Sequence, residues 1–159
     1  MGGSVEKVRE EILKKGYKMD YEIAECVKHI DSRGFLVEFL KNIELPEDQQ
    51  KFGQIYFVTF EKPMQARGNH YHTRFSEWFG VAHGKLEVVL EDVRTKERKE
   101  LVLFSDDKTF TRIRISPYIA HAFRNLSPNA VLLDYCNQQY NPKDNDRNPY
   151  VLISPNPNG

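Results

Sequence analysis

The chain has 159 residues, which suits one domain, and 40% of them are hydrophobic, enough to fill a core. Lys and Arg total 23, as do Asp and Glu, and this zero formal net charge argues against nucleic acid or an anionic membrane as the main partner, since both attract a basic excess. No apolar run approaches the ~20 residues that span a bilayer and no secretory leader is visible, so we expect a cytoplasmic protein.

In chain order, the first predicted element is a helix over residues 5–16, where apolar residues from Val5 to Leu13 recur on one face and Gly16 can end it. From residue 23 onward the chain changes to short runs rich in Val, Ile, Phe and Tyr that end at Gly, Pro, Asn or Asp, which is typical of strands. The predicted strands cover residues 23–30, 35–40, 54–60, 68–72, 77–82, 85–92, 99–104, 110–115, 120–125 and 130–136. Many short strands with little helix predict an all-β sandwich or barrel. We therefore expect an N-terminal helical extension over residues 1–22 and a single β domain over residues 23–159.

Three histidines and one glutamate form the pattern most typical of a functional site. Side chains alternate across a strand, so His70 and His72 point to the same face. Glu77 begins the next predicted strand, where its carboxylate can reach the same point. His121 lies far downstream, and we expect the turn after Pro117 to deliver it from the opposite wall.

This combination predicts a metal site. A single histidine on a strand is more often a packing residue or a surface hydrogen bond, but a His-x-His pair followed by Glu77 and a later His121 is much more specific. Three imidazoles and one carboxylate suit a divalent transition metal, with one or two positions left for water or substrate. We predict that His70, His72, Glu77 and His121 hold such a metal, with zinc expected first and iron, manganese or nickel as alternatives.

These spacings carry a family resemblance. The string His70-x-His72-x4-Glu77-x6-Gly84 is similar to the first motif of the cupins, and the string from Pro117 to Asn125 resembles their second motif. The resemblance implies the cupin fold, a double-stranded β-helix or jelly-roll barrel.

A second set of strings resembles the cupins that act on nucleotide-linked sugars. Residues 31–35 with Glu38 are similar to a string of the dTDP-4-dehydrorhamnose 3,5-epimerases in which an Arg, here Arg33, and the Glu contact the nucleotide. The string from Arg67 to His72 resembles those epimerases, the sugar 3,4-ketoisomerases, and the zinc cupin domain of capsular polysaccharide epimerase/reductases. Tyr140 begins a string similar to the epimerase Tyr-x-Pro. The resemblance implies substrate binding by Arg33, Glu38 and Arg67.

The resemblance leaves the catalytic groups open. In the epimerases the histidine equivalent to His70 is a base, but a histidine that binds a metal through its free lone pair cannot also accept a proton. The epimerase position that carries a proton-donating tyrosine is Asp134 here, and Tyr135 would face the other side of its strand. The candidates for proton transfer are therefore His70 and His72 themselves, a hydroxide on the metal, or a tyrosine. The tyrosine candidates are Tyr56, Tyr71 and Tyr140.

We expect a metal-dependent epimerase or ketoisomerase that acts on a dTDP- or UDP-linked 4-keto-6-deoxy sugar through an enolate. The base removes the proton beside the carbonyl, and the metal stabilises the oxyanion. The alternatives are another small-molecule cupin enzyme, such as an iron dioxygenase or a sugar-phosphate isomerase, and a non-catalytic cupin that binds a sugar or a metal. A homodimer is expected, because small cupins expose strand edges that pairing would cover.

Overall fold

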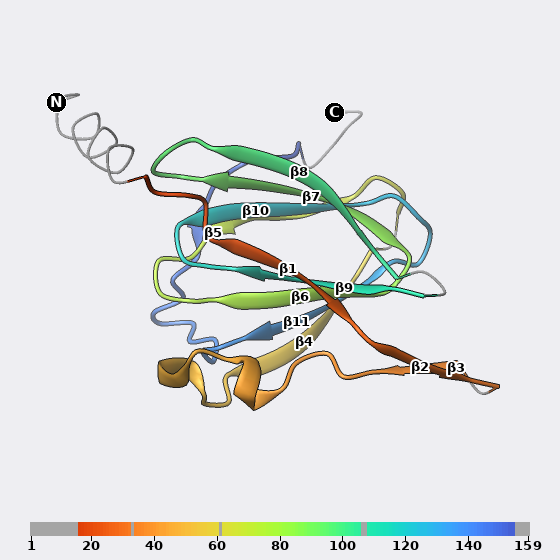
Figure 1. The fold of residues 1–159 in the computed structure, drawn as a ribbon. Helices are drawn as coiled ribbons and strands as arrows, with labels where there is room; N and C mark the ends of the chain where they lie inside the picture. The colour runs from red at the N-terminus through yellow and green to blue at the C-terminus, as the bar shows by residue number, and fades with distance from the viewer. Residues whose placement is uncertain (1–15, 33, 61, 106–107, 155–159) are drawn as a thin grey trace, which may run out of the picture.

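The computed structural model describes residues 16–32, 34–60, 62–105 and 108–154. Nearly all regular structure in these ranges is β, which confirms the predicted all-β class (Figure 1). The predicted helix falls on residues 1–15, outside the described ranges, and the division at residue 22 stays a prediction. Among the described residues no helix is long and apolar enough to cross a membrane.

Two five-stranded antiparallel sheets pack face to face. The first contains, in spatial order, β1 (Tyr21–Cys26), β9 (Phe110–Ile115), β6 (Glu77–His83), β11 (Val131–Cys136) and β4 (Gln54–Thr59). The second contains β12 (Asn148–Pro149), β5 (Ala66–Tyr71), β10 (Ile119–Asn125), β7 (Lys85–Asp92) and β8 (Arg98–Phe104). The described part of the chain thus forms the two-sheet jelly roll expected of a cupin, but not a closed barrel.

A small hairpin and two turns complete the described structure. The hairpin consists of β2 (Lys28–Asp31) and β3 (Gly34–Val37) and projects beyond the two sheets (Figure 1). The 3-10 turns η1 (Asn42–Glu44) and η2 (Glu47–Gln49) lie in the connection from β3 to β4.

The sequence prediction was wrong at the first strand. A single strand was expected over residues 23–30, but the structure has β1 and β2 separated at Val27. The last pair of the β1–β9 ladder joins Cys26 to Phe110, the first residue of β9, so β1 has no further partner there and β2 pairs with β3 instead. The eight predicted strands from residue 54 onward begin and end within two residues of the observed ones.

The hydrophobic core lies between the two sheets. Strand β7 contributes the fully buried side chains of Leu86, Val88 and Leu90, which alternate with residues that face outward. Its neighbour β10 adds Ile119 and Phe123 from the same sheet, and strands β6, β9 and β11 of the other sheet supply the facing apolar side chains. Phe79 and Phe123 belong both to this core and to the lining of a cavity, so the packed interior directly supports the candidate site.

Candidate functional site

A β-bulge in β5 shapes one wall of the site. On the neighbouring strand β10, His121 lies opposite His70, but the next residue, Ala122, lies opposite Gly68. Asn69 is therefore an extra residue in β5. Both Gly68 (φ +87°) and Asn69 (φ +55°) have left-handed backbone conformations, which glycine and asparagine adopt most readily.

The bulge changes which side chains share a face. Arg67 is paired with Phe123 on β10, and the Phe123 side chain lines the cavity, so Arg67 faces the cavity together with His70. Without the extra residue, Arg67 and His70 would point to opposite faces, because they are three positions apart. Glycine is required at position 68, since a Cβ there would lie 2.7 Å from the backbone oxygen of His121.

The four predicted metal ligands come together. One ligand atom from each of His70, His72, Glu77 and His121 lies within 4.8 Å of all the others. The Nε2 atoms of His72 and His121 each lie 3.4 Å from Oε2 of Glu77.

One expectation about this cluster was wrong. His121 does not come from the opposite wall, because β10 is the direct neighbour of β5 and His121 is paired with His70. It is Glu77, on β6, that reaches across from the other sheet.

Backbone carbonyl groups fix the orientation of all three imidazole rings. The Nδ1 atoms of His70, His72 and His121 lie 2.9 Å from the oxygen of Gly68, 2.5 Å from that of Asp146 and 3.3 Å from that of Ile119, respectively. A carbonyl oxygen only accepts hydrogen bonds, so each Nδ1 donates and each Nε2 keeps its lone pair. At His70 the 2.9 Å contact with Gly68 sets this tautomer, because the contact with Arg147 Nε, which would need the other tautomer, is longer at 3.4 Å. The Nε2 atom of His72 is buried and has no hydrogen-bond partner among the described residues.

Burial and mutual charge set the protonation of the cluster. Burial, followed by the neighbouring His121, lowers the pKa of His70 to about 3, and burial also lowers the pKa of His121. At His72 burial acts in the same direction, but the Glu77 carboxylate outweighs it and raises the pKa. Burial would raise the pKa of Glu77, yet the adjacent His72, whose Nε2 lies 3.4 Å from Oε2 of Glu77, and the other two imidazoles hold it below its usual value. Neutral imidazoles at His70 and His121 and an ionised Glu77 follow at neutral pH.

These features fit a divalent metal. A tetrahedral site with bonds of ~2.1 Å separates its ligand atoms by ~3.4 Å, which equals the distances from Glu77 to His72 and His121. The orphaned Nε2 of His72 and the outward hydrogen bonds from the Nδ1 atoms are typical of metal-binding histidines. The structure thus provides a cluster that could bind a metal, while the identity of the metal stays a prediction.

The cluster opens into a cavity of about 530 Å³. That volume is within the usual range for small-molecule sites. Arg67 and Arg147 supply cationic groups to its lining, and Tyr56 and Tyr140 supply hydroxyl groups. The Tyr56 hydroxyl donates a hydrogen bond to Oε1 of Glu77 at 3.3 Å.

The other predicted site residues lie in different places. Tyr71 is on the outer face of β5, where its ring centroid is 6.5 Å from that of Tyr118 and 6.1 Å from that of Tyr150, so it does not reach the cavity. Glu38 is exposed and paired with Lys41 at 2.8 Å, outside the cavity lining. Arg33 lies outside the described residues.

Three residues near the cluster were not singled out for a role from the sequence. Arg147 lies with Nε 3.4 Å from Nδ1 of His70, and the Asp146 carbonyl oxygen accepts the hydrogen bond from His72. Both belong to a tail rich in Asn and Pro, in which no periodic pattern marks an inward-facing side. Asp134 has both carboxyl oxygens buried, and its position was noted only as the place of a missing tyrosine. A buried aspartate on an otherwise apolar strand was the available signal.

Comparison with known proteins places the chain among sugar-modifying enzymes. The protein-family model described as "Polysaccharide biosynthesis C-terminal domain" matches residues 29–148. A curated relative, the TDP-4-oxo-6-deoxy-alpha-D-glucose-3,4-oxoisomerase of Aneurinibacillus thermoaerophilus, is 24% identical over 126 residues, which cover 79% of this chain and 85% of that protein.

Solved structures agree with this result. A 3,4-ketoisomerase from Helicobacter canadensis superimposes with a TM-score of 0.67 and 27% identity, covering 82% of this chain and 90% of that one. The sugar 3,4-ketoisomerase QdtA from Thermoanaerobacterium thermosaccharolyticum, in complex with TDP, has a TM-score of 0.66 and 18% identity over 80% and 85% of the two chains. The predicted resemblance to the sugar ketoisomerases is confirmed, and with it the prediction of an isomerase.

Proposed function

This chain belongs to the polysaccharide biosynthesis C-terminal domain family, and on that premise we propose that it isomerises a nucleotide-linked 4-keto-6-deoxy sugar, by ketoisomerisation or epimerisation. The named substrate of the curated relative, a TDP-linked 4-oxo-6-deoxyglucose, supports this substrate class. The complex of QdtA with TDP supports a nucleotide in the same fold.

One observation carries the proposal: the same cavity holds a buried His/Glu cluster and two arginines. Arg67 and Arg147 line this cavity along with His70. Arginine offers a forked donor that matches phosphate oxygens, so these two residues suit the diphosphate of a nucleotide sugar. The imidazole cluster then lies where the sugar attached to that diphosphate would reach.

The roles of the side chains follow from the site. We propose His70, His72, Glu77 and His121 as the ligands of a divalent metal, zinc first, which when bound would polarise the sugar carbonyl as a Lewis acid. Burial, followed by the charges of Glu77 and Asp134, raises the pKa of Tyr56 far above its usual value. Tyr56 therefore keeps its proton at neutral pH and can donate a hydrogen bond to an enolate oxygen, but it cannot act as the base.

Tyr140 is the tyrosine we propose for proton transfer. It lines the cavity, and its backbone nitrogen donates to Oε1 of Gln54 at 2.8 Å, which fixes the start of the tail beside β4. Tyr71, the other candidate expected from the sequence, is too far from the cavity to exchange a proton with a bound sugar.

The direct test is deuterium exchange. The protein is incubated in D2O with TDP- and UDP-linked 4-keto-6-deoxyglucose, and the sugar is followed by NMR. We expect deuterium at a carbon beside the carbonyl and the appearance of a 3-keto or epimerised product with one of the two nucleotides. Tight nucleotide binding without exchange or product would reject the isomerase and leave a binding protein. Oxygen consumption by the Fe(II)-loaded protein would favour the dioxygenase instead.

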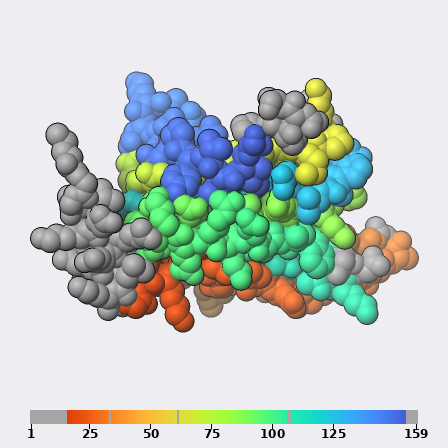
Figure 2. All heavy atoms as spheres, turned by 90° about the horizontal axis from the view of Figure 1, so that it is seen from above, coloured from red at the N-terminus to blue at the C-terminus, as the bar shows by residue number. Residues whose placement is uncertain are grey.

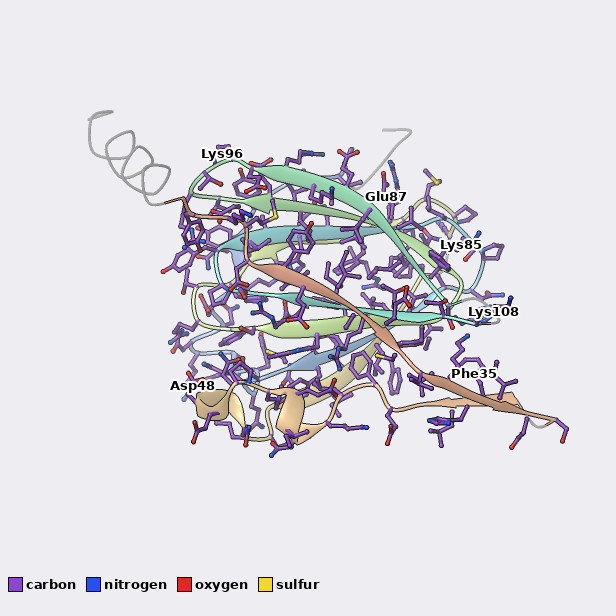
Figure 3. All side chains as sticks on the ribbon, in the orientation of Figure 1. Phe35, Asp48, Lys85, Glu87, Lys96 and Lys108 are labelled. Atoms are coloured by element: carbon purple, nitrogen blue, oxygen red, sulfur yellow. The ribbon has the colours of Figure 1, made fainter. Side chains whose placement is uncertain are left out.

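We also propose a homodimer. The projecting hairpin presents Ile30, Phe35 and Leu36 with at least half of each side chain exposed (Phe35 is labelled in Figure 3). The edge strand β4 exposes Ile55 and Phe57 in the same way. Burying such surfaces against a second copy would remove both the exposed apolar area and the unpaired strand edge. Light scattering should give twice the chain mass, and a monomer that persists at micromolar concentration rejects the dimer.

A further inference from the structure

The C-terminal segment (residues 144–153) folds back over β5, the strand that carries His70 and ends just before His72. Strand β12 pairs with β5, so that Asn148 lies opposite Tyr71 and Pro149 opposite His70. In the space-filling view the C-terminal residues, in blue, cover the surface beside the green strands β7 and β8 (Figure 2). Lys96, at the turn between these strands, donates to the hydroxyl of Tyr150 at 2.8 Å.

The bulged Asn69 is one anchor of this segment. Its backbone oxygen accepts a hydrogen bond from Tyr150 N at 2.8 Å, and its side-chain amide donates to the oxygen of Ile153 at 2.8 Å. Its Oδ1 accepts from the backbone nitrogens of Leu152 and Ile153 at 2.9 and 3.0 Å. The residue that turns Arg67 toward the cavity therefore also holds the end of the chain.

Asp146 is the second anchor. Its carboxylate accepts hydrogen bonds from Thr73 N at 2.9 Å, Thr73 Oγ1 at 2.6 Å and Arg74 N at 2.7 Å. Only 4% of this side chain is exposed. These donors belong to the turn that directly follows His72, so the carboxylate fixes the Asp146 peptide relative to that histidine.

The same residue contacts the cluster through its backbone. The carbonyl oxygen of Asp146 accepts the hydrogen bond from His72 Nδ1 at 2.5 Å. This bond selects the tautomer whose Nε2 faces Glu77, 3.4 Å away. One residue of the tail thus fixes both the turn after His72 and the imidazole ring of His72.

We propose that Asp146 is a positioning residue for the metal ligand His72, and that metal binding and docking of the C-terminal segment stabilise each other. The inference rests on the metal site of the proposed function. Two events that share one hydrogen bond are linked reciprocally: a docked segment raises the affinity for metal, and bound metal protects the segment. Arg147, next to Asp146, is brought to His70 by the same docking.

The test uses the full chain and Zn²⁺ as the probe. Zn²⁺ affinity is measured by competition with a chromophoric chelator for the wild type, for Asp146→Ala and for Asp144→Asn. Asp144 is the matched control, because it lies in the same segment and also pairs with Arg74, but 63% of its side chain is exposed and it does not contact His72. We expect Asp146→Ala to weaken Zn²⁺ binding ~10–100-fold, and Asp144→Asn to leave it nearly unchanged.

Hydrogen exchange supplies a readout that needs no variant. Zn²⁺ should slow amide exchange across residues 145–153 of the wild type, beyond its effect on β8, which is remote from the cluster. Two outcomes overturn this inference alone. One is tight Zn²⁺ binding with the same affinity in Asp146→Ala as in the wild type, and the other is tight Zn²⁺ binding that does not change amide exchange in the C-terminal segment. A wild type that binds no Zn²⁺ overturns it together with the metal part of the proposed function. A failure of the isomerase assay does not bear on either measurement.

Discussion

Glu77 and Asp134 place two carboxyl groups in one buried region between the sheets. They lie on the neighbouring strands β6 and β11, where Glu77 is paired with Cys136 and Asp134 with Phe79, so the two acids are diagonal neighbours. Glu77 is 3% exposed and Asp134 is fully buried. Burial, followed by the charge of Glu77, raises the pKa of Asp134 well above its usual value. Of the two acids, Asp134 is therefore the one that holds its proton to the higher pH.

The first prediction concerns the pH dependence of stability in the chelator-treated protein. Because the pKa of Asp134 is raised on folding, this group binds more protons in the folded protein than in the unfolded chain above ~pH 4. The free energy of unfolding that the protonated Asp134 contributes is therefore lost as the pH rises toward its pKa in the folded protein. Asp134→Asn cannot ionise and should lose less stability between pH 5 and 8. Urea unfolding at several pH values measures the difference, with a wild-type slope steeper by up to ~1.4 kcal/mol per pH unit. Parallel profiles would show that Asp134 is already ionised in the folded protein.

The second prediction concerns metal content. Elemental analysis of the purified protein should find about one equivalent of a divalent transition metal, lost in His72→Ala, because three ligands hold a metal much less tightly than four. Chelation should lower the melting temperature of the wild type, since the metal binds only the folded state. His83→Ala is the control, because His83 is exposed at the end of β6 and should keep both the metal and the thermal shift. Metal-free wild type would release His70 and His72 for acid–base catalysis.

The third prediction concerns the bulge. Gly68→Ala adds a Cβ 2.7 Å from the His121 oxygen at a backbone φ of +87°, so we expect a loss of ~2–4 kcal/mol in the free energy of unfolding. Gly34→Ala separates the two causes, because Gly34 also has a positive φ, +127°, but has open space where its Cβ would lie. Urea denaturation of both variants should show the larger loss for Gly68→Ala. Equal losses would mean that the contact with β10 relaxes without cost.

Local sequence pattern predicted much of this structure, and long-range pairing explains what it missed. Alternation set the strand bounds from residue 54 onward, and the His-x-His pair and Glu77 fell at the predicted cluster. The position of His121 depends on β10 being the neighbour of β5, a pairing between segments about fifty residues apart that neither segment encodes alone. The bulge at Asn69 turns the Arg67 side chain to the cavity face of β5, which strict alternation of side chains cannot predict.

The contacts of the C-terminal residues with the site could not be predicted for a different reason. Residues 141–150 have no apolar alternation, and they are held by individual hydrogen bonds to Asn69, to the turn after His72 and to β5. Each of these bonds joins residues about seventy or more positions apart. Arg147 and Asp146 could therefore be assigned to the site only from the folded structure.

The fourth prediction concerns the two cavity arginines. If Arg67 and Arg147 bind the diphosphate, Arg67→Gln and Arg147→Gln should each weaken the binding of TDP or UDP ~10–100-fold, since a charged hydrogen bond contributes ~1.5–3 kcal/mol. Arg98→Gln is the matched control, because Arg98 lies on β8, pairs with Glu100 at 3.1 Å and is absent from the cavity lining. Calorimetry at two salt concentrations measures the affinities, and the wild type should lose more affinity with added salt than either cavity variant.

The Arg67 side chain also donates a hydrogen bond to the Thr59 oxygen at 2.9 Å. A melting curve of Arg67→Gln must therefore show that the fold is kept before its nucleotide affinity is interpreted. Nucleotide affinity that is unchanged in both variants would place the diphosphate elsewhere on the protein.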